Sequence, residues 1–244
     1  MLKLFSGNKE KIDFSILRAD MHSHLLPGID DGSPDMETSL KLVQGMTELG
    51  YKKLITTPHI MWDMYKNTRV IILGKLEELK KAVKEAGINV ELQAAAEYFL
   101  DDYVAGLLNN KETLLTISGN MVLVELSMAN PSLGFKDILF EMHMQGYQPV
   151  LAHPERYIYL EYGRNFFDEL KTAGCMFQLN LLSLGNYYGR SANELAHFLI
   201  KKEYYDLVGT DLHTAYHLQA LQDPALSAPL KRLLDSGRII NDRL

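Results

Sequence analysis

The feature that most constrains the fold is a regular alternation of short apolar segments with longer amphipathic segments. Seven short, mostly apolar runs have the length of β-strands: residues 19–22, 53–57, 90–96, 121–124, 149–152, 176–181 and 207–209. Between them apolar residues recur at helical spacing, as Met36, Leu40 and Val43 do after the first run. Strands that alternate with helices predict a parallel sheet with the helices outside it.

The predicted helices cover residues 34–49, 70–86, 135–145, 166–173, 192–202 and 224–236. Ser33 is the predicted N-cap of the first helix, and Pro34 its first residue. About seven strand-then-helix units without a linker favour one α/β domain that forms a closed or nearly closed barrel. An open doubly wound sheet is the alternative. We assign residues 19–244 to this domain and residues 1–18 to an N-terminal extension.

Residue types that bind metal ions follow one predicted strand after another. They are His22, His24, His59, Glu97, Glu125, His153, Asp211 and His213. Each of them alone is more often an ordinary polar residue, so the argument depends on their coincidence across strands. In an α/β barrel the carboxyl ends of the strands converge on one face, which would bring these residues into one pocket. Imidazole and carboxylate ligands suit Mn, Fe or Zn, and bridging carboxylates predict more than one ion.

Two local patterns strengthen this prediction. His22 and His24 are two residues apart, so in an extended strand both imidazoles point to the same side and can reach one ion. The GIDDG segment that follows contains Asp30 and Asp31, and its glycines allow a sharp turn close to the site. An aspartate-rich turn without a metal is the alternative for this segment taken by itself.

Arg156 is the predicted phosphate-binding and catalytic residue. It follows His153 by three positions, and a guanidinium group matches two oxygens of a phosphoryl group. The alternative is a surface arginine that pairs with Glu155. His217 lies close enough to His213 in sequence to be a second, weaker candidate for substrate binding.

Composition excludes several other classes of function. The formal net charge of −6 does not favour nucleic acid or an anionic membrane as a partner. No apolar run approaches the roughly 20 residues of a membrane span, and the first residues lack the features of a signal peptide. Cys175 is the single cysteine, so no internal disulfide can form. We therefore expect a cytoplasmic protein without membrane insertion, in which Cys175 is a buried structural residue.

The sequence resembles a known protein family. The segments that carry the resemblance are DMHSHLLPGIDDG, TTPH, AAAEYFLD, VLVELS, LAHPERY, LGNYYG and GTDLH, in this order from Asp20 to His213. They resemble the polymerase-and-histidinol-phosphatase superfamily, and within it the bacterial manganese-dependent protein-tyrosine phosphatases of capsule and exopolysaccharide gene clusters. The resemblance implies a distorted seven-unit (β/α) barrel that binds two to three divalent ions, with Mn expected first and Fe, Co or Zn as alternatives.

The resemblance also implies a role for each matching residue. His22, His24, Glu97 and Asp211 would hold the first metal. Glu97 would bridge to a second metal, which Glu125 and His153 also hold. The third would be held by Asp31, His59 and His213. Some members carry an arginine shortly after the final DxH; this chain does not, and His217 or a backbone group would take its place.

The implied activity is hydrolysis of phosphotyrosine. The expected substrate is a phosphotyrosine protein, namely a bacterial tyrosine kinase that regulates capsular or exopolysaccharide synthesis. Two alternatives stay open: a phosphatase of a small alkyl phosphate ester, and a metal-binding regulator without catalytic activity. The sequence does not define the oligomeric state.

Overall fold

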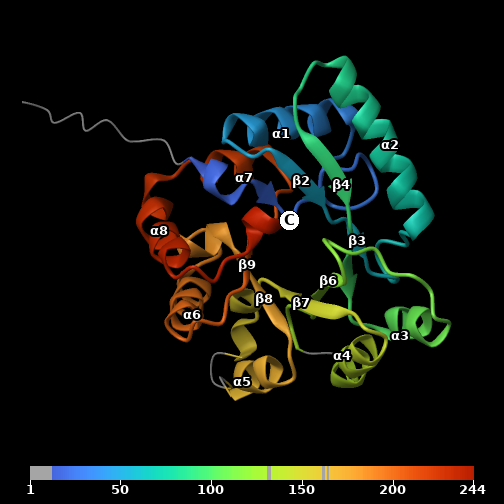
Figure 1. Ribbon diagram of the computed structural model, residues 1–244, viewed down its shortest axis with the longest axis vertical. Helices are drawn as coiled ribbons and strands as arrows, with labels where there is room; N and C mark the ends of the chain where they lie inside the picture. Colours follow the sequence, from blue (N-terminus) through green and yellow to red (C-terminus); the bar gives the residue numbers. More distant parts are fainter. Residues whose placement is uncertain (1–12, 131–132, 161–162, 164) are drawn as a thin grey trace, which may run out of the picture.

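The protein forms parallel β-strands surrounded by α-helices (Figure 1). The computed structural model describes residues 13–130, 133–160, 163 and 165–244. The strands are β1 (Ala19–Asp20), β2 (Lys53–Thr56), β3 (His59–Ile60), β4 (Glu91–Ala94), β5 (Glu97–Phe99), β6 (Met121–Glu125), β7 (Gln148–Ala152), β8 (Met176–Asn180) and β9 (Leu207–Gly209).

The strands pair in chain order, and every pair is parallel. One ladder runs β1-β2-β4 and the other β3-β5-β6-β7-β8-β9. An isolated parallel bridge between Ser23 and Leu212 joins the segments that follow β1 and β9. Strand order that follows the chain without a reversal is typical of a barrel and not of a doubly wound sheet. The predicted α/β fold is confirmed, although the strand ladders of the described residues do not form a single continuous ring.

Two of the predicted strands are interrupted, and both interruptions serve the site. The strand of residues 53–57 breaks at Thr57 and Pro58 and resumes as β3, because proline has no N–H to donate to a ladder. The neighbouring strand likewise breaks between β4 and β5. After the breaks, His59 pairs in register with Glu97. The interruptions therefore start two short strands on residues with metal-binding side chains.

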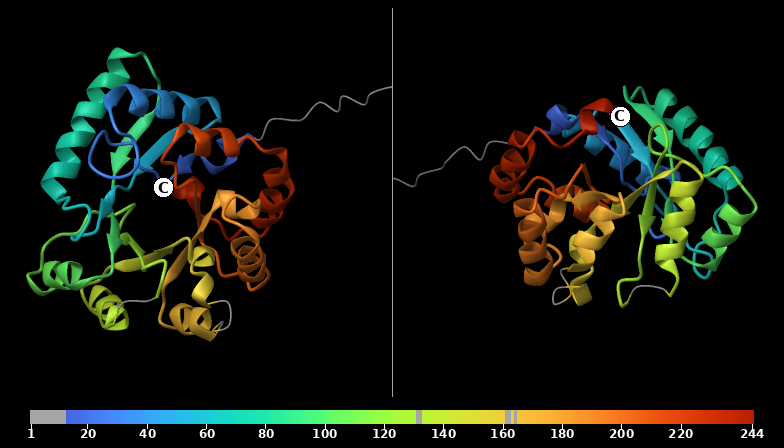
Figure 2. Two further views of the ribbon diagram at one scale, coloured as in Figure 1. Left: turned by 180° about the vertical axis from the view of Figure 1, so that it is seen from behind. Right: turned by 60° about the horizontal axis from the view of Figure 1, so that its bottom comes forward.

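The helices lie outside the strands, as the view from behind and the tilted view show (Figure 2). They are α1 (Met36–Glu48), α2 (Arg69–Glu85), α3 (Asp102–Asn109), α4 (Phe135–Met144), α5 (Asn165–Thr172), α6 (Arg190–Lys201), α7 (Ala215–Ala220) and α8 (Ser227–Asp235). Short 3-10 helices cover Phe14–Leu17, Pro154–Arg156, Ile158–Leu160, Leu181–Leu184, Pro224–Leu226 and Asn241–Arg243.

The predicted start of the first helix was wrong. Asp35 is the N-cap, and its side chain accepts a hydrogen bond from the backbone N–H of Thr38. Ser33 instead donates from its hydroxyl to the carbonyl of Asp35, and its own carbonyl accepts from the N–H of Gly28. Ser33 thus belongs to the turn that precedes the helix, where it holds the aspartate-rich loop closed.

Alternate residues of the strands face two different cores. A small inner cluster contains Met21, Ile55, Leu123, Val150 and Leu207, and Ile240 and Leu244 near the C-terminus pack against it. Their apolar neighbours in sequence, such as Leu54, Val122 and Leu151, belong to the larger outer cluster, which the helices cover. The two clusters leave the carboxyl ends of the strands free for polar side chains.

Part of the predicted N-terminal extension packs against the domain. Phe14 and Leu17 are buried, and the ring of Phe14 stacks on Tyr51 with centroids 5.5 Å apart. Residues 1–12 lie outside the described residues. Among the helices described, none combines the length and the apolar character needed to cross a membrane.

Candidate metal centre

The predicted ligands gather around one pocket at the carboxyl ends of the strands. The pocket has a volume of about 430 Å³. Its lining consists of Asp31, His59, Met61, Met64, Tyr65, Glu125, Met128, His153, Arg156, Tyr188, Asp211, His213 and His217. The other three predicted ligands, His22, His24 and Glu97, are fully buried and contact the lining residues.

The first group of possible ligands is His22, His24, Glu97 and Asp211, all of them buried. The Nε2 atom of His22 lies 3.1 Å from Oε2 of Glu97 and 3.3 Å from Oδ1 of Asp211. The Nε2 atom of His24 lies 3.5 Å from each of the same two oxygens. Two imidazoles and two carboxylates therefore surround one point.

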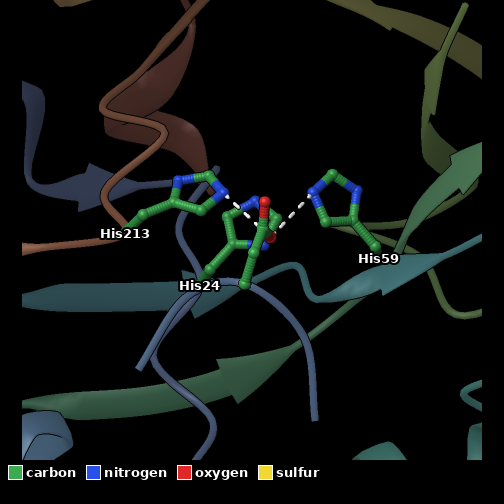
Figure 3. Close-up of side chains that lie close together, drawn as sticks. His24, His59 and His213 are labelled. Carbon is green, nitrogen blue, oxygen red and sulfur yellow. Dashed lines mark ion pairs between the residues drawn. The ribbon is translucent and has the colours of Figure 1, made fainter. Parts of the chain in front are cut away.

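The second group is His24, Asp31, His59 and His213. The carboxylate of Asp31 lies between two imidazoles, because its Oδ1 atom is 3.4 Å from Nε2 of His59 and 3.4 Å from Nε2 of His213. Figure 3 shows the three imidazoles converging, with dashed lines for these two ion pairs. The rings of His24 and His213 stack with centroids 3.9 Å apart.

The third group is His59, Glu97 and Glu125. Here the Nδ1 atom of His59 faces the carboxylates, at 2.8 Å from Oε1 of Glu125 and 3.3 Å from Oε2 of Glu97. His153 belongs to none of the three groups found among the described residues, although its Nε2 atom is 3.1 Å from Oε1 of Glu97. Consequently, the division into groups differs from the expected one at His24, His59 and His153, and the three groups contain eight of the nine predicted ligands.

The spacing of the ligand atoms in the first two groups fits a bound metal ion. Nitrogen and oxygen ligands about 2.1 Å from a tetrahedral ion lie roughly 3.4 Å from each other. The closest approaches in the first two groups, 3.1–3.5 Å, match this value. The buried Oε2 atom of Glu97 has three imidazoles within 3.5 Å but no hydrogen-bond partner among the described residues. A buried carboxylate oxygen without a partner is costly unless a cation neutralises it.

A second layer of side chains orients the imidazoles. The Nδ1–H of His22 donates to Oε1 of Gln178 at 2.8 Å, and Nδ1 of His24 pairs with Oδ2 of Asp30 at 2.9 Å. These contacts leave the Nε2 atoms of both rings directed at Glu97 and Asp211. Partners of this kind fix the tautomer and orientation of metal-binding histidines. Gln178 was missed from the sequence, although a polar residue inside the apolar strand MFQLN was a signal.

Two predicted ligands have an unusual backbone conformation. His153 has φ of 35° and Asp211 has φ of 51°, in the left-handed region that few residues other than glycine adopt. Each follows its strand closely, β7 or β9. Strained backbone of this kind is concentrated at functional sites, where the surrounding structure holds it in place.

Burial and neighbouring charges shift the pKa values of two residues in the site, Glu97 and His153. Burial alone would raise the pKa of Glu97, but the imidazoles of His22 and His59 outweigh it and hold this pKa well below the ordinary value. Burial and the nearby Arg156 guanidinium lower the pKa of His153 to about 4. Glu97 is thus a carboxylate and His153 a neutral imidazole at pH 7, which are the forms that bind metals.

Arg156 reaches the pocket wall and does not pair with Glu155. Its Nη1 atom lies 2.7 Å from Oδ2 of Asp211, and a quarter of its side chain is exposed. Glu155 turns inward instead, where it accepts hydrogen bonds from the backbone N–H of Asn180 and the hydroxyl of Tyr205. The pairing with Glu155, which was the alternative for a surface arginine, is therefore wrong.

His217 lies beside Asp211 and His213. Its Nδ1 atom accepts a hydrogen bond from the backbone N–H of His213 at 3.2 Å, and its ring meets Tyr187 edge-on. It comes from α7, a short helix that sequence reasoning did not predict. His217 belongs to the pocket lining, so it is available to a molecule bound there.

Comparison with known proteins agrees with the fold and with the resemblance in sequence. The tyrosine-protein phosphatase YwqE of Bacillus subtilis is 24% identical over 194 residues, which cover 80% of this chain and 76% of YwqE. The putative tyrosine-protein phosphatase CapC of Staphylococcus aureus is 24% identical over 92% of each chain. The tyrosine-protein phosphatase CpsB of Streptococcus pneumoniae is 25% identical over 80% of this chain and 82% of CpsB.

A solved structure has the same fold. It comes from work on YwqE of Bacillus subtilis and CpsB of Streptococcus pneumoniae, described as unique metal-dependent tyrosine phosphatases. Its TM-score is 0.76 at 22% identity, over 91% of this chain and 96% of the other. The family described as capsular polysaccharide synthesis, CpsB/CapC, matches residues 18–231, and the chain therefore belongs to this family.

Proposed function

We propose that the protein is a metal-dependent phosphatase that hydrolyses phosphotyrosine in other proteins. The observation that carries this proposal is the overlap of three possible ligand groups, in which His24, His59 and Glu97 each belong to two. Shared ligands place ions close together, an arrangement that enzymes use to hold the attacking and leaving oxygens of a phosphoryl group. We propose two to three ions with Mn as the preferred metal, because the ligands are carboxylates and imidazoles without thiolates.

The nine proposed ligands are those of the sequence prediction: His22, His24, Asp31, His59, Glu97, Glu125, His153, Asp211 and His213. When bound, divalent ions would neutralise phosphoryl charge and make water a better nucleophile near neutral pH. The buried position of Glu97 between His22, His24 and His59 supports its role as a bridge. Gln178 and Asp30 keep the two HxH imidazoles aimed at the ion site.

Arg156 would bind the phosphoryl group. Its guanidinium belongs to the pocket lining, and one of its nitrogens is already held by Asp211. The other N–H groups of the guanidinium can donate charge-assisted hydrogen bonds to phosphoryl oxygens as negative charge develops on them. His217 lines the same pocket and would contact the phosphoryl group or the leaving oxygen.

One wall of the pocket is apolar, which supports an aromatic ester as substrate. Met61, Met64, Tyr65 and Met128 line it, and Met64 and Met128 are exposed. Methionine sulfur and flexible methionine chains make favourable contacts with aromatic rings. The charged residues would hold the phosphoryl end of phosphotyrosine, and the apolar wall would hold its ring.

The names of the relatives support the same substrate, and their family supports a role in capsular polysaccharide synthesis. We propose a bacterial tyrosine kinase of that process as the phosphotyrosine protein. The cytoplasm is the proposed location, because the single cysteine, Cys175, is a buried free thiol.

The experiment combines metal analysis with hydrolysis assays. We expect purified protein to contain more than one divalent ion, to lose activity on chelation, and to recover it with Mn. It should cleave phosphotyrosine peptides faster than small alkyl phosphates. Rapid cleavage of alkyl phosphates alone would favour the small-ester phosphatase, and metal binding without any hydrolysis would favour the non-catalytic regulator.

A further inference from the structure

The LGNYYG segment contributes Tyr188 to the pocket lining, where the ring of Tyr188 contacts Arg156. The guanidinium carbon of Arg156 lies 4.4 Å from the centroid of the Tyr188 ring. Arg156 follows β7, whereas Tyr188 comes from the loop after β8, so two neighbouring loops meet at this contact. Arginine stacks on aromatic faces because its planar cation is weakly hydrated and attracted by the ring.

A small polar network fixes the same two residues. The Nδ2 atom of Asn180 donates to the hydroxyl oxygen of Tyr188 at 3.2 Å and to Oδ2 of Asp211 at 3.0 Å. Arg156 donates to that same Oδ2 atom at 2.7 Å. The Oδ1 atom of Asp211 faces the imidazoles of His22 and His24. Asp211 thus joins the arginine to the ligand groups, and the Tyr188 ring covers one face of the arginine.

The loop that carries Tyr188 is itself tied to the fold. The side-chain amide of Asn193 in α6 donates to three successive carbonyls, those of Ser183, Leu184 and Gly185. The Oδ1 atom of Asn180 accepts from the N–H of Leu182, which sets the orientation of the Asn180 amide. The ring of Tyr188 is therefore a fixed surface, which a mobile loop would not provide.

We propose that Tyr188 is a positioning residue for Arg156. Its ring, and not its hydroxyl, holds the guanidinium plane so that the exposed nitrogens face a phosphoryl group in the pocket. A long arginine side chain otherwise samples many rotamers, and fixing one of them in advance lowers the cost of binding. This inference rests on the proposed function, because it concerns the orientation of Arg156 toward a phosphate ester.

The test compares Tyr188→Leu with Tyr188→Phe in metal-loaded protein. The readouts are the Kd for inorganic phosphate by calorimetry, kcat and KM on a phosphotyrosine peptide, and metal content. Loss of the stacked ring in Tyr188→Leu should weaken phosphate binding and kcat/KM roughly three- to thirtyfold with metals retained. Tyr188→Phe keeps the ring and should stay within about twofold of wild type.

A matched control is Tyr204→Leu. The Nζ atom of Lys202 lies 5.9 Å from the Tyr204 ring centroid, so this variant also removes an aromatic partner of a cation, but away from the pocket. It should leave phosphate binding unchanged. In an Arg156→Ala background, Tyr188→Leu should have no further effect, because Tyr188 acts through that arginine. An equal loss in both backgrounds, or an equal loss in Tyr188→Phe and Tyr188→Leu, would overturn the inference.

A spectroscopic readout separates this inference from the proposed function. The Nε–H signal of Arg156 should carry a ring-current shift that persists in Tyr188→Phe and disappears in Tyr188→Leu, with or without activity. Wild-type protein that neither binds phosphate nor hydrolyses any ester would refute the proposed function. An Arg156 signal that is the same in wild type and Tyr188→Leu would refute the positioning role by itself.

Discussion

The Oε1 atom of Gln178 lies 2.8 Å from Nδ1 of His22, so a carboxamide in β8 fixes the ring of a histidine that follows β1. Because a carboxamide oxygen only accepts hydrogen bonds, the proton of His22 must be on Nδ1. In the neutral ring, which is the form that binds a metal, the lone pair is then on Nε2, which faces Glu97 and Asp211. The strand positions thus determine the tautomer of a proposed metal ligand.

Replacing Gln178 should therefore weaken metal binding without removing a ligand. We expect Gln178→Leu to lower the affinity for the tightest ion about 10–100-fold, as loss of an orienting partner does in other metal sites. Competition with a metallochromic chelator measures this affinity. Gln148→Leu, at the start of β7, is the control and should have no effect on metal affinity. Unchanged affinity in Gln178→Leu would contradict the orienting role.

Arg156 tests the chemistry separately from the metal content. Arg156→Ala should keep its ions but lose charge-assisted hydrogen bonds to the phosphoryl group, worth about 1.5–3 kcal/mol apiece. We expect kcat/KM to fall about ten- to a hundredfold or more, and inhibition by free phosphate to weaken in parallel. Arg156→Lys should recover only part of the loss, since lysine keeps the charge but not the planar fork. A value within twofold of wild type for Arg156→Ala would remove Arg156 from the mechanism.

Gly32 lies against the backbone of the HxH segment. A Cβ atom there would lie 2.3 Å from both the Cβ and the carbonyl oxygen of His24. Gly32→Ala should therefore displace His24, lower the free energy of unfolding by about 1–3 kcal/mol and reduce metal content. Gly74→Ala is the matched control, because a Cβ at this position of α2 meets no atom within 4 Å. That variant should gain roughly 0.5–1 kcal/mol from higher helix propensity, as thermal unfolding can measure.

Metal binding should release protons. Burial alone would lower the pKa of His24, but Asp30 and Asp211 outweigh it and raise this pKa well above its ordinary value. At His59, burial and the charge of His24 would lower the pKa. The carboxylates of Glu125 and Glu97 outweigh both effects and raise the pKa of His59 well above its ordinary value. Both imidazoles are then protonated at pH 7 in metal-free protein, and an ion must displace a proton from each.

The affinity should consequently fall as the pH is lowered, since protons compete for the same nitrogens. Calorimetric titration with Mn in buffers of different ionisation enthalpy counts the protons released at pH 7. Heats that do not depend on the buffer would show that no proton leaves and would contradict this prediction.

The apolar wall of the pocket, formed by Met61, Met64, Tyr65 and Met128, should favour aromatic esters over alkyl esters. Replacing Met64 and Met128 together by Ser removes apolar surface that we assign to the phosphotyrosine ring. Loss of roughly 1 kcal/mol of apolar contact should raise KM for an aryl phosphate on the order of fivefold. KM for a small alkyl phosphate should not change, which serves as the internal control. A parallel rise for both esters would show that these side chains do not contact the ring.

The strand ends could be predicted from the sequence because short apolar runs end in residues such as His153 and Glu125, and parallel strands end on one face. The partners of those residues could not be predicted. Arg156 stands beside Glu155 in the chain, but it pairs with Asp211 after the fold brings β7 and β9 to the same face. The predicted sets of ligands likewise separate His24 from Asp31, whereas the turn after β1 brings them together.

Other differences between the predicted and the observed structure have local physical reasons. The α7 helix has six residues and buries none of them, so it leaves no apolar period in the sequence. The interruption at Pro58 is visible as a proline, but its effect, the pairing of His59 with Glu97, depends on a second interruption in the neighbouring strand. The boundary of the N-terminal extension stays a prediction, because its first part lies outside the described residues.

The contact between the segments after β1 and β9 also sets an order of events during synthesis. The N–H of Asp211 donates to the carbonyl of His22, and the N–H of His24 donates to the carbonyl of Leu212. A ribosome makes His22 and His24 early, but the two ligand groups that contain His24 also need Asp211 or His213. A growing chain has neither group complete until the segment after β9 has emerged and docked. We therefore expect an ion to bind there late, because an unfinished chain lacks part of both groups.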